Sequence, residues 1–167
     1  MTEGKIYVLD ANVFIEAARR YYAFDIVPAF WQALLAHASS TRLLSIDRVR
    51  GELQRGNDEL AQWARSDFDQ WFASTDQDDV VQAYGQIMRW AQAEEQFTAA
   101  AKAGFADQEN ADAWVVAYAK TRGYVVVTHE QFEAKSKKIK IPNACEAFSV
   151  PYVDTFRMLR ELGVRLG

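Results

Sequence analysis

The sequence has little of several residue types that mark particular classes of protein. Its 167 residues include one cysteine, Cys145, so no disulfide can form within the chain. The two histidines, His37 and His129, have no second histidine or cysteine at zinc-site spacing. Apolar runs are short and broken, for example by Asp10, and none approaches the roughly 20 residues of a membrane span. These absences exclude a disulfide-stabilised domain, a zinc site and a membrane-spanning helix.

A surplus of positive charge is also missing. The chain carries 19 Lys and Arg against 23 Asp and Glu, for a net charge of −4. A surface that is acidic as a whole does not attract a polyanion, so any contact with nucleic acid is expected to be local. The N-terminal residues after Met1 do not form a basic segment followed by an apolar one. We therefore expect a cytoplasmic protein without a signal peptide.

What the sequence contains is enough apolar residues for one substantial core. Half of the residues are hydrophobic and 25% are charged. Three prolines and eight glycines are spread thinly, with no linker-like segment and no repeat. We expect residues 1–167 to form a single domain, with a helical segment at about 58–104.

Short, largely apolar segments predict strands buried on both faces. They are residues 6–9, 43–46 and 124–128, with a further short strand at 139–141 before Pro142. Helical spacing of apolar residues predicts helices from Asn12, from Pro28, from about 46 to Gly56, within 58–104, from about Asp112 to Gly123 and from Val153 to Leu162. Strands separated by helices predict an α/β fold with a parallel sheet.

Four acidic residues are the candidates for chemistry. Asp10 ends the first predicted strand, and Glu130 follows the clearest one. Ligands of open α/β sheets bind beyond the carboxyl ends of the strands. Asp112 lies on the helix face expected to pack on the sheet, and Glu52 borders the apolar stripe of its helix. The competing interpretation is that these acids cap helices or lie in solvated loops.

Taken together, the four carboxylates are the ligand set of a hard cation. Carboxylate oxygens suit Mg²⁺ or Mn²⁺, and no cysteine or histidine cluster accompanies them. The sequence has no glycine-rich phosphate loop and no G-x-S-x-G nucleophile motif. The residues therefore favour a site for a divalent metal over nucleophilic catalysis by serine.

The order of these motifs resembles a PIN domain across nearly the whole chain. Residues 7–15, YVLDANVFI, are similar to the family's opening strand with its Asp and Asn. Glu52 in residues 45–53 and Asp112 in residues 111–119 match the second and third acids. The segment VVTHEQF, residues 126–132, matches the strand followed by an acid.

The resemblance is closest to a bacterial subgroup that carries Thr-His-Glu followed by a Lys-Ile-Pro segment. Here these correspond to residues 128–130 and to residues 139–142, IKIP. Glu130 departs from the aspartate that PIN domains more often have at this place. Its longer side chain reaches a metal directly or through water, and the sequence does not distinguish the two.

The resemblance implies a three-layer fold and a Mg²⁺- or Mn²⁺-dependent endoribonuclease that cleaves single-stranded or structured RNA. Many small bacterial members are toxins of toxin-antitoxin pairs, which implies an antitoxin partner, and a homodimer is a further assembly to test. The metal would be held by Asp10, Asp112 and Glu52 or Glu130. Asn12 and Thr128 would support these acids or contact phosphate, or else act as a cap and a turn residue.

Two basic segments are candidate RNA contacts. Arg19 and Arg20 precede two tyrosines that can stack on an unpaired base. The densest basic run comprises Lys135, Lys137, Lys138 and Lys140, close after Glu130. The plain alternative for both segments is a solvated surface.

Two other functions compete with a nuclease. A haloacid-dehalogenase-like phosphohydrolase also ends its first strand with Asp, but needs a second Asp where this chain has Asn12. A non-catalytic interaction module would use the acids only as helix caps. Stabilisation by a divalent metal separates that module from an enzyme.

Overall fold

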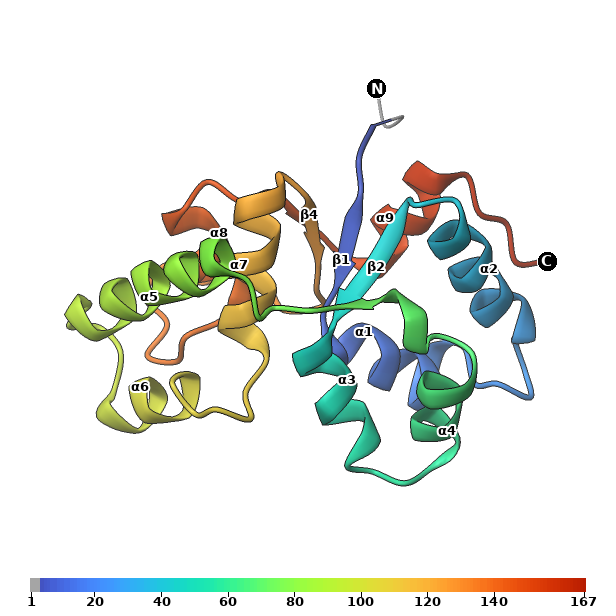
Figure 1. Cartoon of the computed structure of the whole chain (residues 1–167), viewed down its shortest axis with the longest axis horizontal. Helices are drawn as coiled ribbons and strands as arrows, with labels where there is room; N and C mark the ends of the chain where they lie inside the picture. The colour runs from blue at the N-terminus through green and yellow to red at the C-terminus, as the bar shows by residue number, and fades with distance from the viewer. Residues whose placement is uncertain (1–3) are drawn as a thin grey trace.

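The computed structural model describes residues 4–167 and places a parallel sheet between layers of helices (Figure 1). The strands are β1 (Tyr7–Leu9), β2 (Leu43–Ile46), β3 (Phe72–Ala73), β4 (Val125–Val127) and β5 (Tyr152–Val153). Their order in the sheet is β3-β2-β1-β4-β5, and every pairing is parallel. The predicted α/β fold with a parallel central sheet flanked by helices is confirmed.

Strand β1 occupies the centre of the sheet and pairs with two segments that are distant in sequence. Tyr7 lies opposite Leu43 of β2 on one side and Val125 of β4 on the other. All three residues of β1 and all three of β4 are buried. Helices cover both faces of a parallel sheet, which explains why these strands are apolar without alternation.

Helices lie on both sides of the sheet: α5, α7 and α8 on one side, and α2 and α9 on the other (Figure 1). Their bounds are α1 Ala11–Glu16, α2 Pro28–Ser39, α3 Asp47–Gln54, α4 Glu59–Ser66, α5 Asp78–Ala93, α6 Ala99–Phe105, α7 Asp112–Arg122, α8 Ile141–Ala147 and α9 Thr155–Leu162. A π-helical turn, Ala17–Tyr21, extends α1, and a 3₁₀ turn, Asp69–Trp71, precedes β3. Helix α7 ends at Gly123, whose positive φ of 73° suits a glycine.

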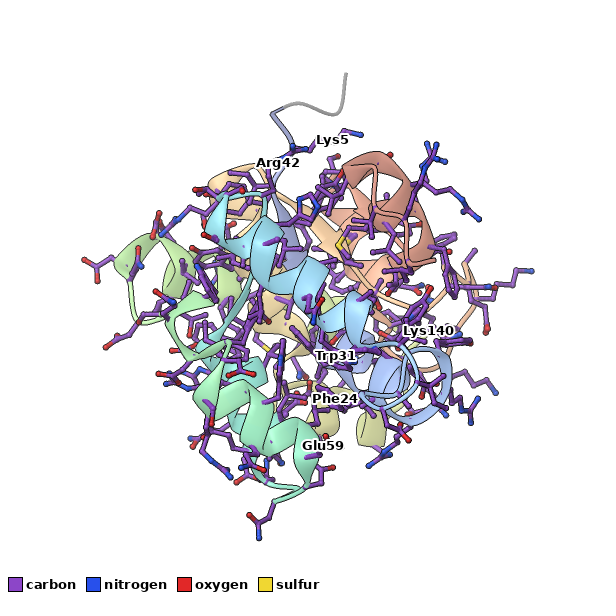
Figure 2. All side chains as sticks on the ribbon, turned by 90° about the vertical axis from the view of Figure 1, so that its right-hand side faces the viewer. Lys5, Phe24, Trp31, Arg42, Glu59 and Lys140 are labelled. Atoms are coloured by element: carbon purple, nitrogen blue, oxygen red, sulfur yellow. The ribbon has the colours of Figure 1, made fainter. Side chains whose placement is uncertain are left out.

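Aromatic rings fill the space between α1, α2 and α4. Phe24 stacks on Trp31 with ring centroids 4.0 Å apart, and Figure 2 shows the two side chains one above the other. Trp31 in turn packs on Trp63 of α4. Phe14 of α1 contacts Trp63 and Phe68, with centroids 6.0 and 5.5 Å away. This packing fixes α1, the first helix after the Asp10 loop, against the rest of the core.

Three features differ from the sequence prediction. The strand predicted at 139–141 is wrong, because Ile141 begins α8 and Pro142 lies in the first turn of that helix. Proline has no N–H to leave unsatisfied there, so it favours a helix start. Val153 belongs to β5, not to the terminal helix, which begins at Thr155. The segment 58–104 contains α4, α5 and most of α6, but also the edge strand β3.

No helix within residues 4–167 is long and apolar enough to cross a membrane. Cys145 is buried and has no disulfide partner, as the sequence requires.

Candidate active site

Asp10 and Glu130 stand at the carboxyl ends of two neighbouring strands, β1 and β4. The backbone N–H of Asp10 donates to the carbonyl of Val127 at 3.0 Å, so the two strand ends are joined directly. The Asp10 side chain is only 1% exposed. Asp10 occupies the N-cap position of α1 with extended backbone, yet its carboxylate accepts no capping hydrogen bond. The helix-cap interpretation of Asp10 is therefore wrong.

Thr128 links the two acids through its hydroxyl group. The hydroxyl donates to Oδ2 of Asp10 at 3.2 Å and accepts the backbone N–H of Glu130 at the same distance. The Thr128 side chain is 1% exposed, so water does not compete for these bonds. This arrangement holds the Asp10 carboxylate and the loop that carries Glu130 in a fixed relation.

Glu52 ties α3 to the start of α7, next to Asp112. Oε1 of Glu52 accepts the backbone N–H of Ala111 at 3.3 Å, which ties α3 to the residue preceding Asp112. Ala111, not Asp112, is the N-cap of α7, and the Asp112 N–H donates to Oδ1 of Asn110 at 2.9 Å. The cap interpretation of Asp112 is wrong too, because this carboxylate lies in the first turn and no hydrogen bond occupies it within residues 4–167.

Glu130 uses one oxygen to hold the following helix. Its Oε1 accepts the backbone N–H of Ile141, the first residue of α8, at 3.1 Å. The ten residues between them form a loop that contains the lysine run. The side chain of Glu130 is half-buried, and its carboxylate contributes to the field at Asp10 and Asp112.

The four acids repel one another, and burial intensifies this effect. Burial raises the pKa of Asp10 well above its ordinary range, and Asp112, Glu130 and Glu52 raise it further. The pKa of Asp112 rises to about 7, again first through burial and then through Glu130 and Glu52. Burial also raises the pKa of Glu52, against the effect of the Ala111 N–H. The structure thus brings all four predicted acids into one electrostatic group.

The donor set of this group fits a hard divalent cation. All four side chains are carboxylates, and the most buried, Asp10, receives a single hydrogen bond from a side chain. Buried charge of this kind needs a counter-charge. Among residues 4–167, no three Asp, Glu, His or Cys side chains are already close enough together to hold a metal ion. An ion at the group would therefore have to draw the carboxylates inwards.

Asn12, another predicted site residue, lies at the surface near the acids. Asn12 is exposed and lines a small cavity with Glu16, Tyr21, His129 and Glu130. It forms no hydrogen bond to the Asp10 loop, so the expected ordering of that loop falls to Thr128 instead.

The basic residues lie at the surface. Arg19 is exposed, and Arg20 forms an exposed ion pair with Glu16 at 3.4 Å. Lys135, Lys137 and Lys138 are exposed on the loop between β4 and α8, whereas Lys140 pairs with Glu133 at 3.2 Å. Three lysines of the run are thus exposed on the loop that follows Glu130 in sequence.

A cavity beside the acids contains residues that the sequence analysis did not connect. It has a volume of about 420 Å³ and is lined by residues on both sides of Glu130 and by Tyr21, Asp154 and Phe156. A signal was present in the sequence, since Asp154 directly follows a strand and Phe156 lies two residues later. That strand, β5, has only two residues and no recognisable pattern, so the residues after it could not be placed at the sheet end.

Solved structures share this fold. The structure of VapBC2 from Rickettsia felis bound to a promoter DNA fragment matches with 17% identity and a TM-score of 0.53, over 89% of this chain and 98% of the matched chain. FitAB bound to the IR36 DNA fragment matches with 19% identity and a TM-score of 0.54, over 89% and 94%. FitAcB from Neisseria gonorrhoeae matches with 19% identity and a TM-score of 0.53, over 88% and 96%.

These likenesses show that the chain has the fold of the PIN-domain toxins, as the resemblance of its motifs predicts. No relative matches among curated proteins. A family model matches residues 7–166, which include all four acids. The chain therefore belongs to the PIN-like family described as the domain of unknown function DUF4411.

Proposed function

We propose that this protein is a divalent-metal-dependent endoribonuclease that acts in the cytoplasm as the toxin of a toxin-antitoxin pair. The observation that carries the proposal is the Asp10 carboxylate, which is buried at a strand end, caps no helix and is repelled by three other acids. Such an arrangement costs stability and is maintained at sites that bind a cation. The shared fold of the PIN-domain toxins supports the choice of reaction.

Mg²⁺ or Mn²⁺ would be held by Asp10 and Asp112, with Glu52 or Glu130 completing the set. When bound, such an ion supplies an activated water and neutralises charge that develops on the scissile phosphate. Thr128 orients the Asp10 carboxylate through its 3.2 Å hydrogen bond. Glu130 has one oxygen engaged by Ile141, which leaves the other oxygen for the ion or for a water molecule.

Positive charge for the RNA strand would come from the surface beside the acids. Lys135, Lys137 and Lys138 are exposed on the loop that follows Glu130. Each phosphate contact of this kind adds affinity that weakens with salt. Because the net charge of the whole chain is −4, attraction for RNA would be local to this loop.

The direct test is cleavage of a fluorescent single-stranded RNA. We expect cleavage in Mg²⁺ or Mn²⁺ and none in excess EDTA. A second RNA that forms a stable hairpin separates loop cleavage from cleavage of any strand. Absence of cleavage of both RNAs, with a protein that is folded by circular dichroism and supplied with either ion, would overturn the proposal.

The alternative of a non-catalytic module depends on the acids serving as helix caps. Asp10 forms no capping bond, and Asp112 is not the N-cap of its helix. The phosphohydrolase alternative needs an acid at Asn12, whose amide cannot supply a proton in the same way. Neither alternative accounts for four carboxylates in one group.

An antitoxin partner follows from the same site. A cluster of carboxylates can be neutralised by an Arg side chain, which pairs with a carboxylate through two hydrogen bonds. We expect a small partner that places Arg or Lys at Asp10 and Asp112 and thereby blocks the metal position. The neighbours VapBC2 and FitAB, which were solved bound to DNA, support an antitoxin partner in general.

Expression of the chain alone should slow growth, and co-expression with the gene next to it in the native genome should restore growth. The co-purified complex should regain RNA cleavage after the partner is removed by denaturation and refolding. Free, fully active protein in a native lysate, with no partner recovered, would contradict this prediction.

A further inference from the structure

The cavity of about 420 Å³ beside Glu130 is lined by aromatic rings. Two of the exposed large hydrophobic residues of the described chain, Tyr21 and Phe132, line it, and each is 47% exposed. His129, Tyr152 and Phe156 contribute further rings to its lining. The volume lies within the range of about 300–1,000 Å³ that small-molecule sites occupy. Exposure of such rings to water is unfavourable, so they are candidates to contact a ligand.

The position of Tyr21 is set by an irregular helix. Helix α1 continues into the π-helical turn Ala17–Tyr21, which closes with a 2.8 Å hydrogen bond from the Tyr22 N–H to the Ala17 carbonyl. The π-helical turn carries one residue more than an α-helical turn and shifts the side chains after it, a feature often found at functional sites. Tyr21 is thereby brought against His129 and Phe156, with ring centroids 5.8 and 5.4 Å away.

A hydrogen bond with a residue of α9 holds the ring of His129 in place. Its Nε2 forms a 3.0 Å hydrogen bond with the hydroxyl of Thr155, a buried residue of α9. His129 lies 5.8 Å from Phe156 and next in sequence to Glu130. The rings therefore form a surface assembled from the π-helical turn after α1, the loop after β4 and the start of α9.

This surface is continuous with the carboxylate group. Thr128 and Glu130 line the same cavity as the rings. Tyr21, His129 and Glu130 also line the smaller cavity that contains Asn12. A strand of RNA whose phosphate lies at the acids would thus place a neighbouring base over Tyr21.

From this geometry, and resting on the proposed ribonuclease function, we infer that the cavity is a stacking subsite for one unpaired RNA base next to the scissile phosphate. Tyr21 is the main stacking surface, and Phe132 is a second exposed ring in the lining of the cavity. Asp154 and Gln131, which also line the cavity, offer an acceptor and an amide to the edge of the base. Double-stranded RNA, whose bases are stacked on each other, cannot use the subsite.

The test compares three variants by fluorescence anisotropy with a labelled single-stranded RNA in EDTA, and by cleavage in Mg²⁺. Tyr21→Ala removes the ring, Tyr21→Trp keeps a stacking surface, and Ile26→Ala is the matched control. Ile26 is 76% exposed on the same segment but does not line the cavity. Stacking on an aromatic side chain contributes about 1–3 kcal/mol per base, so Tyr21→Ala should weaken binding about tenfold. Tyr21→Trp and Ile26→Ala should bind within about twofold of the original protein.

The same RNA is then prepared with one abasic nucleotide at each position in turn. At one position, the abasic nucleotide should weaken binding to the original protein about tenfold. It should not change binding to Tyr21→Ala, because the missing base and the missing ring remove the same contact. Equal sensitivity of the two proteins at every position would overturn the subsite. So would unchanged affinity of Tyr21→Ala.

The binding measurement separates this inference from the proposed function. If the original protein binds and the abasic pattern appears but no RNA is cleaved, the subsite stands and the nuclease assignment fails. If RNA is cleaved but Tyr21→Ala binds and cleaves like the original, the nuclease assignment stands and the subsite is wrong. Circular dichroism of Tyr21→Ala checks that the variant is folded.

Discussion

Replacement of Asp10 or Asp112 by asparagine should lower Mg²⁺-dependent RNA cleavage by at least about a hundredfold. Loss of residues that merely support a metal ligand costs 10- to 100-fold in affinity or activity, and loss of a ligand itself should cost more. Asparagine keeps the size and one oxygen of each side chain, so the variants should remain folded. Initial rates at saturating Mg²⁺ measure the effect, and expression of either variant alone should no longer slow growth.

Glu95→Gln is the matched control for this experiment. Glu95 is exposed, lies between α5 and α6 and is not one of the four acids. The Glu95→Gln substitution removes one negative charge from the chain, as the test variants do. It should leave the cleavage rate within about twofold of that of the original protein. Near-normal cleavage by Asp10→Asn or Asp112→Asn would remove that residue from the metal site.

The second large effect is a reversal of stability between metal-free and metal-bound protein. In EDTA, Asp112→Asn should be as stable as the original protein or more stable by about 1 kcal/mol, because it relieves repulsion in the carboxylate group. In Mg²⁺ at about 100 times the dissociation constant, the original protein should gain about 2.7 kcal/mol. The variant should gain little. Melting temperatures of both proteins in EDTA and in Mg²⁺ measure the difference, and equal metal shifts would contradict a ligand role for Asp112.

The pH dependence of stability in EDTA also distinguishes the original protein from Asp112→Asn. The pKa of Asp112 is raised from 3.8 to about 7, so the folded protein binds more protons than the unfolded chain between these values. Its contribution to stability is therefore present at low pH and is lost as pH rises towards about 7. The unfolding free energy in EDTA should fall over this range, and it should fall less steeply in Asp112→Asn.

Most of the fold could be predicted because its central strands are unambiguous. The segments of β1 and β4 are apolar throughout, as burial on both faces requires, and Gly123 ends α7 where the pattern indicated. The wrong predictions concern elements that are short or whose residue pattern fits more than one structure. β5 has two half-buried residues, and the alternation before Pro142 has the period of a strand although Ile141 starts a helix.

The site could be predicted in its members but not in its internal contacts. Strand ends and helix faces placed Asp10, Asp112 and Glu130 near one another. The bond from Ala111 to Glu52 and the bonds of Thr128 depend on tertiary packing, which no local pattern records. For the same reason the sequence could not show whether the Asp10 carboxylate caps a helix or is buried without capping one.

The central place of β1 also bears on when the carboxylate group assembles during synthesis of the chain. Residues 7–9 leave the ribosome early, yet their partner in β4 begins at Val125. Asp112 and Glu130 also emerge well after β2, which pairs with the other side of β1. Contacts so distant in sequence close late in folding. A nascent chain therefore holds no assembled carboxylate group until most of its length, through Glu130, has been translated.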